Sequence, residues 1–465
     1  MKVSFFLLGT NIMLMCQSIT AFVLSPLVSS WQQQFQPHAT KSLTFILYET
    51  SMKNDVVVPS KSQPRIGFFH SLLDWALDSP LWTYVLVPQA RQKMMDTAAS
   101  NGIPWMEYRE WIQQQYQFKQ QQKQQQQSSS AFSLTHIPSY YCQPFHAYRN
   151  GNLNWEAAWE AEIASAAVGA RNFPTYGSKG EDAFRRSFQI CLQEELGATI
   201  PTKSQQQYQQ QEHLEGKNNH NYNNHNNNIT FVDLGCGTGR STRWWAEQYP
   251  PEQVDTFIGI DMSPYFIDVA QSLLEWHPKS REDDGPWVHT IQPDSRIHYQ
   301  VGCAEATGLP DNSVDIVNLQ FVAHELPTHI LRQVIQEAYR ILRSDGGQLW
   351  ISEMDFDTPA YAAQRANPFL FGLLRATEPY LDDYADHAPE ILRTELQRLF
   401  VHTRIGAATG RHLAIVATKG TISNTETTTT DNLPKQEHIW EDVRFDENGI
   451  YKMEDTHLKV WENKI

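Results

Sequence analysis

The feature that most constrains this chain is a change of pattern at residue 229, where short apolar segments begin to alternate with amphipathic ones. Strands joined through helices run parallel and are covered on both faces, so residues 229–420 are predicted to form an α/β sheet. A helical insertion over 359–399 precedes a closing antiparallel hairpin at 401–405 and 412–418. The predicted strands are Thr230–Asp233, Thr256–Asp261, His298–Val301, Val314–Leu319 and Gln348–Glu353, and the predicted helices are Arg240–Gln248, Tyr265–Glu275 and Thr328–Leu342.

A glycine-rich loop lies where the first of these strands must turn into a helix. The segment Phe231-Val-Asp-Leu-Gly-Cys-Gly-Thr-Gly239 carries Gly235, Gly237 and Gly239, which let the backbone turn sharply and approach a ligand without a Cβ atom in the way. An acidic residue, Asp261, ends the next strand. Together these features predict a nucleoside-containing ligand at the carboxyl edge of the sheet. The alternative for Asp261 is that it only caps the following helix.

A dinucleotide-binding oxidoreductase is the main alternative class. Its fingerprint needs a third glycine three positions after the second, and that position is Arg240. In addition, Asp233 stands where that fingerprint expects an apolar residue. The spacing therefore favours a ligand without a pyrophosphate.

The loop resembles the first motif of class I S-adenosylmethionine (SAM)-dependent methyltransferases, particularly the small-molecule group called type 11. The resemblance implies a Rossmann-like α/β sandwich with a mostly parallel seven-stranded sheet and a closing antiparallel hairpin. It implies that Asp261 accepts hydrogen bonds from both ribose hydroxyls, that Met262 packs on adenine, and that the loop holds the methionine portion. The loop residues concerned are Asp233, Gly235, Cys236, Gly237 and Gly239.

Later segments extend this resemblance, with one departure. Gly302-Cys303-Ala304-Glu305 followed by Leu309-Pro310 is similar to the family's Gly-Asp-Ala-Glu and Leu-Pro landmark, with Cys303 in place of the aspartate. By the same resemblance Cys303, Ala304 and Gln320 belong to the cofactor site. Glu305 has the alternative interpretation of a solvated loop residue.

His324 follows the fourth strand and is the candidate general base, because ligands of such sheets bind at the carboxyl edge. The alternative is a structural histidine near the cofactor. Two aromatic-rich segments, Tyr140–Trp155 and Thr377–Tyr384, are candidates to roof an apolar substrate pocket, or else they pack the extension onto the domain. The predicted acceptor is a small molecule methylated on O, C or N, such as a phenolic or quinone-like metabolite. A SAM-binding scaffold without turnover is a further alternative.

The residues before the sheet are predicted to be targeting sequence, helices and linkers. Residues 1–21 have the anatomy of a signal peptide, and the acid-poor stretch at 22–62 suits a transit peptide. Together they resemble the bipartite plastid presequence of algae, and Tyr-Tyr through Gly-Asn-Leu before the core resembles uncharacterised plastid methyltransferases of plants and algae. Plain secretion is the alternative. Residues 63–203 are predicted to be a helical extension, with disordered linkers at 113–130 and 204–228; the tail at 421–465 is assigned no function.

Composition excludes several classes of function. A formal net charge of −15 argues against non-specific nucleic-acid binding. The 5 cysteines form no C-x-x-C pair and no zinc spacing with histidine, so no metal site is predicted from them. The apolar N-terminal run is too short for a stable membrane span. The sequence leaves the oligomeric state open.

Overall fold

The computed structural model describes most of the chain from Val87 onward. The described residues are 87–125, 137–201, 228–274, 276–277, 288–289, 293–375, 377–420 and 438–452. The predicted signal peptide, the transit-peptide-like segment, nearly all of the second linker, and residues 421–437 and 453–465 of the tail lie outside them, so these expectations stay predictions.

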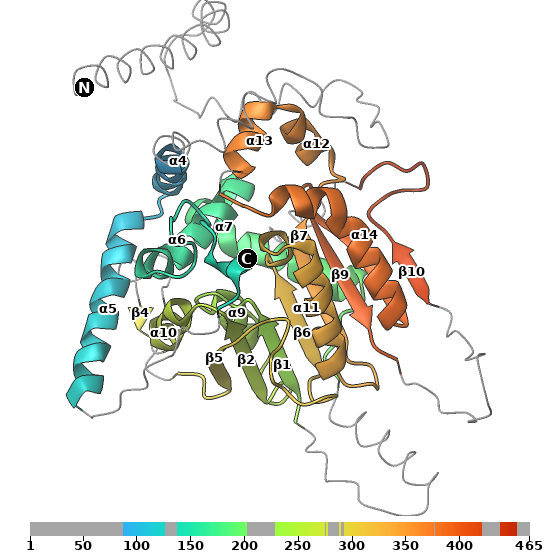
Figure 1. The fold of residues 1–465 in the computed structure, drawn as a ribbon, viewed down its shortest axis with the longest axis horizontal. Coiled ribbons are helices and arrows are strands. Elements are labelled where there is room, and N and C mark those ends of the chain that lie inside the picture. Colours follow the sequence, from blue (N-terminus) through green and yellow to red (C-terminus); the bar gives the residue numbers. More distant parts are fainter. Residues whose placement is uncertain are drawn as a thin grey trace, which may run out of the picture. The chain divides into compact units, whose positions relative to one another are not determined.

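The core is a sheet in the order β10-β8-β9-β7-β6-β1-β2-β5 (Figure 1). The five strands from β5 to β7 in this order are parallel, and β9 pairs antiparallel with both β7 and β8. The predicted parallel sheet with a closing antiparallel hairpin is therefore confirmed. The strands are β1 Thr230–Leu234, β2 Thr256–Asp261, β5 Ile297–Val301, β6 Ile316–Gln320, β7 Gln348–Met354, β8 His402–Thr409, β9 His412–Thr418 and β10 Ile439–Asp442.

The seven predicted strands are all present, and among the described residues β10 adds an eighth strand at the edge of the sheet. β10 comes from the C-terminal tail and pairs parallel with β8, with Ile439 opposite His402. It lies on an edge and is mostly exposed, so it lacks the apolar pattern that reveals a buried strand. A separate two-stranded ribbon joins β3, Trp276–His277, to β4, Val288–His289.

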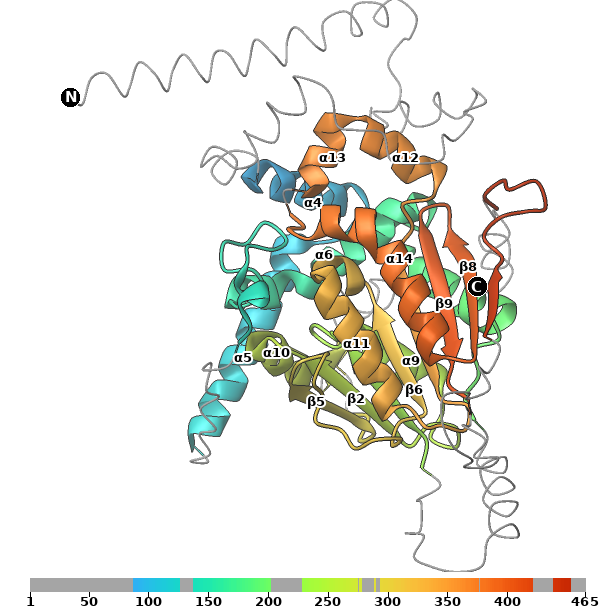
Figure 2. The same cartoon turned by 45° about the vertical axis from the view of Figure 1, so that its right-hand side comes forward.

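Helices cover both faces of the sheet because side chains alternate along each strand. On one face Val232 and Val317 pack against α11, Thr328–Ile341, and α14, Leu381–Leu399 (Figure 2). On the other face Phe231, Phe257 and Trp350 pack against helices that include α7, Gly180–Ile190, and α9, Arg240–Gln248. The helix that follows β2 is α10, Pro264–Leu273.

The N-terminal extension packs directly onto this core. Its elements are α4 Val87–Ser100, α5 Trp105–Gln125, the 3-10 turn η3 Ser139–Cys142, α6 Trp155–Asn172, the 3-10 segment η4 Pro174–Lys179, α7, and the π-turn η5 Cys191–Glu195. The Asn154 side chain accepts a hydrogen bond from the backbone of Ala157 and so caps α6. α6 and α10 share an apolar cluster that contains Ile163 and Phe266.

The prediction of a disordered linker beginning at Gln113 is wrong for residues 113–125, which continue α5. Glutamine is a good helix former, so a Gln-rich composition does not by itself indicate a disordered segment. Tyr116 extends the contact surface, with its ring centroid 4.2 Å from that of Trp155.

The predicted insertion forms α12, Pro359–Ala366, and α13, Pro368–Arg375, and then the long helix α14. A short 3-10 turn η6, Ala323–Glu325, follows β6. Among the helices of the described ranges, none combines the length and apolar character needed to cross a bilayer.

Candidate functional site

The glycine loop between β1 and α9 has the conformation that its sequence predicts. Gly235, Gly237 and Gly239 have φ values of 68°, 55° and 80°, in the region where only glycine is free of strain. A Cβ atom on Gly239 would lie 2.1 Å from the Tyr299 hydroxyl, and one on Gly235 would lie 2.5 Å from Val322. A Cβ atom on Gly237 would meet nothing within 4 Å. The loop is therefore tightly packed at Gly235 and Gly239 and open at Gly237.

Asp233 lies beneath this loop. Its carboxylate accepts hydrogen bonds from Ser241 Oγ at 2.5 Å, Thr242 Oγ1 at 2.6 Å and Asn318 Nδ2 at 2.7 Å. Burial raises its pKa, and these three donors oppose the rise. The side chain thus holds the loop to α9 and β6, and its expected contact with a ligand stays a prediction.

Asp261 ends β2 and faces the open centre of the loop. Its Oδ2 accepts from the Gly237 amide at 2.9 Å, and its Oδ1 accepts from the Ser263 amide at 2.8 Å and from the Tyr141 hydroxyl at 3.1 Å. Burial raises the pKa of Asp261 to about 6, against the effect of these hydrogen bonds. A buried carboxylate with hydroxyl and amide donors is suited to hold a neutral polyol.

The remaining predicted cofactor residues are only partly brought together. Met262 is adjacent to Cys303, with the two sulfur atoms 3.8 Å apart, because the amide of the preceding Gly302 donates to the carbonyl of Asp261. Ala304 packs against the apolar core. The Cys236 side chain is buried in the apolar cluster on the other face of the sheet, so only its backbone is available to a ligand. Gln320 Oε1 accepts from Arg185 of α7 at 3.2 Å.

The aromatic-rich segment before α6 contacts Asp261, a partner that the sequence did not predict for it. Tyr140 donates to Glu305 Oε1 at 2.6 Å while the neighbouring Tyr141 donates to Asp261. Tyr380, from the insertion, donates to the Tyr140 carbonyl at 2.8 Å. The two aromatic-rich segments therefore meet each other beside the loop, and the contact of Tyr140 shows that Glu305 is a paired residue.

His324 forms a buried pair with Glu353 at the end of β7. Its Nδ1 lies 2.7 Å from Glu353 Oε1, and Glu353 Oε2 accepts from the His324 amide at 3.2 Å. Burial lowers the pKa of His324, but Glu353 and, more weakly, Glu378 overcome this and raise it to about 9. Glu353 orients the ring so that Nε2 is the nitrogen left for a ligand, since no residue in the described part of the chain hydrogen-bonds to it.

An ionic network ties the extension to the loop. Arg243 of α9 and Glu162 of α6, both almost fully buried, form an ion pair of 2.6 Å, and Thr238 Oγ1 donates to Glu162 at 2.9 Å. Arg240 likewise pairs with Glu181 of α7 at 3.3 Å. Glu162 and Glu181 are acidic residues on the buried sides of α6 and α7. Their arginine partners lie far away in the sequence, so the ion pairs could not be predicted from it.

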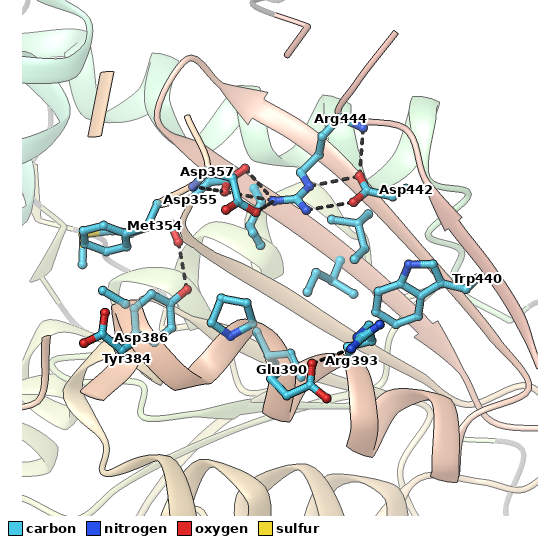
Figure 3. A pocket seen from close by; sticks show the side chains of 17 residues that line it. Met354, Asp355, Asp357, Tyr384, Asp386, Glu390, Arg393, Trp440, Asp442 and Arg444 are labelled. Atoms are coloured by element: carbon cyan, nitrogen blue, oxygen red, sulfur yellow. Dashed lines mark hydrogen bonds and ion pairs between the residues drawn. The ribbon is translucent and has the colours of Figure 1, made fainter. Parts of the chain in front are cut away.

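A cavity of about 350 Å³ lies elsewhere, between the end of β7, α14 and the strands β8 to β10 (Figure 3). Arg444 crosses one wall and is held by Asp355, Asp357 and Asp442. The residues that line this cavity include none of the predicted cofactor residues. It therefore does not belong to the loop site.

Comparison with known proteins gives matches to the sheet region. Residues 232–350 match the model of a family described as "Methyltransferase domain". Arsenite methyltransferase of Rattus norvegicus is 26% identical over 160 residues, 34% of this chain and 40% of that protein. Trans-aconitate 2-methyltransferase of Azoarcus sp. is 30% identical over 139 residues, 30% of this chain and 45% of that protein. A solved SAM-dependent methyltransferase from Aquifex aeolicus is 16% identical, with a TM-score of 0.28 over 41% of this chain and 82% of that chain. The chain spans about half the length, or less, of the curated relatives it matches.

Proposed function

We propose that the protein is a SAM-dependent enzyme that methylates a small molecule, since residues 232–350 match the methyltransferase domain family. The observation that carries the proposal is the pairing of Asp261 with the open loop. The Asp261 carboxylate is anchored by the Gly237 and Ser263 amides, which leaves lone pairs for sugar hydroxyl groups. The unobstructed backbone at Gly237 accommodates the amino-acid end of the cofactor.

Bound SAM supplies a methyl group on a positively charged sulfur, which is an excellent leaving group. The protein therefore contributes chiefly orientation and exclusion of water. When bound, SAM would supply this methyl group to the acceptor atom, and its sulfur would keep the electron pair of the broken carbon–sulfur bond. Where the acceptor carries a proton, His324 Nε2 is the proposed base that takes it, with Glu353 stabilising the resulting imidazolium.

We propose that the cofactor ribose displaces the Tyr141 hydroxyl from Asp261. The Tyr141 hydroxyl occupies an acceptor position on Asp261 that a ribose hydroxyl needs. Cofactor entry then exchanges one donor for another, so that Asp261 is not left unsatisfied. The segment around Tyr141 shifts as the cofactor enters.

The acceptor proposed for this chain is a phenolic or quinone-like metabolite in a plastid. A small acceptor is supported by relatives named for arsenite and trans-aconitate. The plastid part rests on the first 62 residues, whose composition suits a signal peptide followed by a transit peptide. Import of a fluorescent fusion of residues 1–62 into an algal plastid, against secretion of the same fusion, tests this part alone.

Calorimetric titration of the protein with SAM and with its demethylated product tests the cofactor. Binding of both is expected, and no heat with folded protein overturns the proposal. Incubation with methyl-labelled SAM and a plastid small-molecule extract then tests turnover. Label in an organic-soluble product is expected; SAM binding without transfer favours the scaffold alternative, and nicotinamide-dependent absorbance changes favour the oxidoreductase.

A further inference from the structure

A second polar cluster lies beside the loop site and takes no part in the proposed cofactor binding. It joins His146 after η3, Glu325 at the end of η6 and Glu378 just before α14. His146 Nε2 lies 3.2 Å from Glu325 Oε1 and 3.3 Å from Glu378 Oε1. Three chain segments that are distant in sequence thus direct one nitrogen and two carboxylate oxygens at one point.

The tautomer of His146 is set by its other nitrogen. His146 Nδ1 lies 3.4 Å from Asn152 Oδ1, an atom that can only accept a hydrogen bond, so Nδ1 carries the hydrogen. The Asn152 amide in turn donates to Glu325 Oε2 at 3.5 Å. In the neutral ring, Nε2 therefore presents a lone pair to two carboxylates. That arrangement is repulsive unless a cation lies between them, either a proton on the ring or a metal ion.

A proton on His146 leaves the cluster incompletely satisfied. One N–H group cannot donate well to two carboxylates, and Glu378 Oε2 is buried without a hydrogen-bond partner among the described residues. Glu378 itself is only 8% exposed. Two carboxylates, one of them on a buried side chain, thus share a single imidazole nitrogen, and a divalent cation placed between the three atoms satisfies both carboxylates.

The spacing of the ligand atoms distinguishes a metal ion from an organic ammonium group. Metal–ligand bonds of about 2.1 Å hold neighbouring ligands about 3.0 to 3.4 Å apart at octahedral to tetrahedral angles. An ammonium group that donates at about 2.9 Å holds its acceptors about 4.7 Å apart. The separations of 3.2 and 3.3 Å at His146 exclude an ammonium group between these atoms and agree with a metal ion; a direct ion pair of His146 with each carboxylate has the same spacing.

We propose that His146, Glu325 and Glu378 bind a divalent metal ion through one nitrogen and two oxygen atoms. This ligand set suits zinc or manganese, which accept both imidazole and carboxylate. Asn152 orients the imidazole from behind. The His146 side chain is 41% exposed, so the site is open on one side to further ligands such as water. The proposal does not depend on methyl transfer.

The test is a calorimetric titration of chelator-treated full-length protein with ZnCl2 and with MnCl2, without SAM. His213, His220 and His225 lie in the predicted linker 204–228 and are potential metal ligands, so the background protein carries serine at these three positions. One bound ion per chain is expected. Glu378→Gln is expected to weaken binding at least tenfold because it removes one charged ligand.

The matched control is His387→Ala, which removes an exposed histidine paired with Asp383 at 2.9 Å outside the cluster. It should leave metal affinity unchanged. The visible absorption of the cobalt-loaded protein reports imidazole coordination and should change in His146→Ala. No ion bound by the background protein, or equal affinity in the background and both cluster variants with unchanged thermal stability, overturns the proposal. SAM titration of the same samples reports separately on the loop site.

Discussion

Asp261→Asn is the substitution that tests the cofactor site most directly. The change keeps the size of the side chain but removes its charge, and it places an amide NH2 group where a carboxylate oxygen accepts from the Gly237 amide or from Tyr141. A hydrogen bond to a charged group contributes about 1.5–3 kcal/mol. Loss of one such bond to the ribose corresponds to a Kd for SAM about 10 to 150 times higher.

The assay is calorimetric titration with SAM at pH 8, where wild-type Asp261, with a pKa of about 6, is ionised. Asp255→Asn is the matched control, because Asp255 also accepts a backbone amide bond, from Ile229 at 2.8 Å, but lies at the opposite end of the strands. Its Kd for SAM should equal that of the wild type. A Kd within threefold of wild type for Asp261→Asn, in protein that melts normally, refutes the assignment of this carboxylate to the ribose.

Three further predictions concern the same site. In the wild type, the Kd for SAM should rise up to tenfold per pH unit below about 6, because protonation of Asp261 removes the charged acceptor; a flat profile between pH 5 and 7 contradicts this. Gly239→Ala should lower the Tm strongly, since its Cβ atom meets Tyr299 at 2.1 Å. Gly237→Ala should lower the Tm less, through the strain of its positive φ alone, and should also weaken SAM binding because its Cβ atom enters the open space proposed for the cofactor. His324→Gln should reduce kcat about 10²- to 10⁴-fold with little change in SAM affinity. The kcat of the wild type should rise as the pH approaches about 9, because His324 loses its proton there. A kcat that is unchanged by the substitution argues for a structural histidine.

Local patterns were enough to predict much of the sheet. The helix Arg240–Gln248 and the strand Thr256–Asp261 have the predicted bounds. Each depends on residues a few positions apart, whose periodicity or φ preference is set within the segment itself. The glycine loop belongs to the same class, because its positive φ values follow from the residues present.

Composition was a weaker guide than periodicity. The Gln-rich run after Gln113 was predicted to be a linker, yet it continues a helix because Tyr116 can pack on Trp155. The strand at Ile439–Asp442 was missed for a related reason. Its pairing with β8 stabilises an exposed segment whose own side chains carry little strand signal.

Local sequence patterns specify the order of strands and helices along the chain, the loop between the first strand and helix, and Asp261 as the acidic residue beside that loop. The contacts between polar groups come from packing of the whole chain: Tyr141 with Asp261, Arg243 with Glu162, and His146 with Glu325 and Glu378. Backbone preferences act over one or two helical turns, so they depend on residues that are close together in the sequence. A buried charge finds its partner only when the whole chain has packed, and no spacing in the sequence encodes that distance.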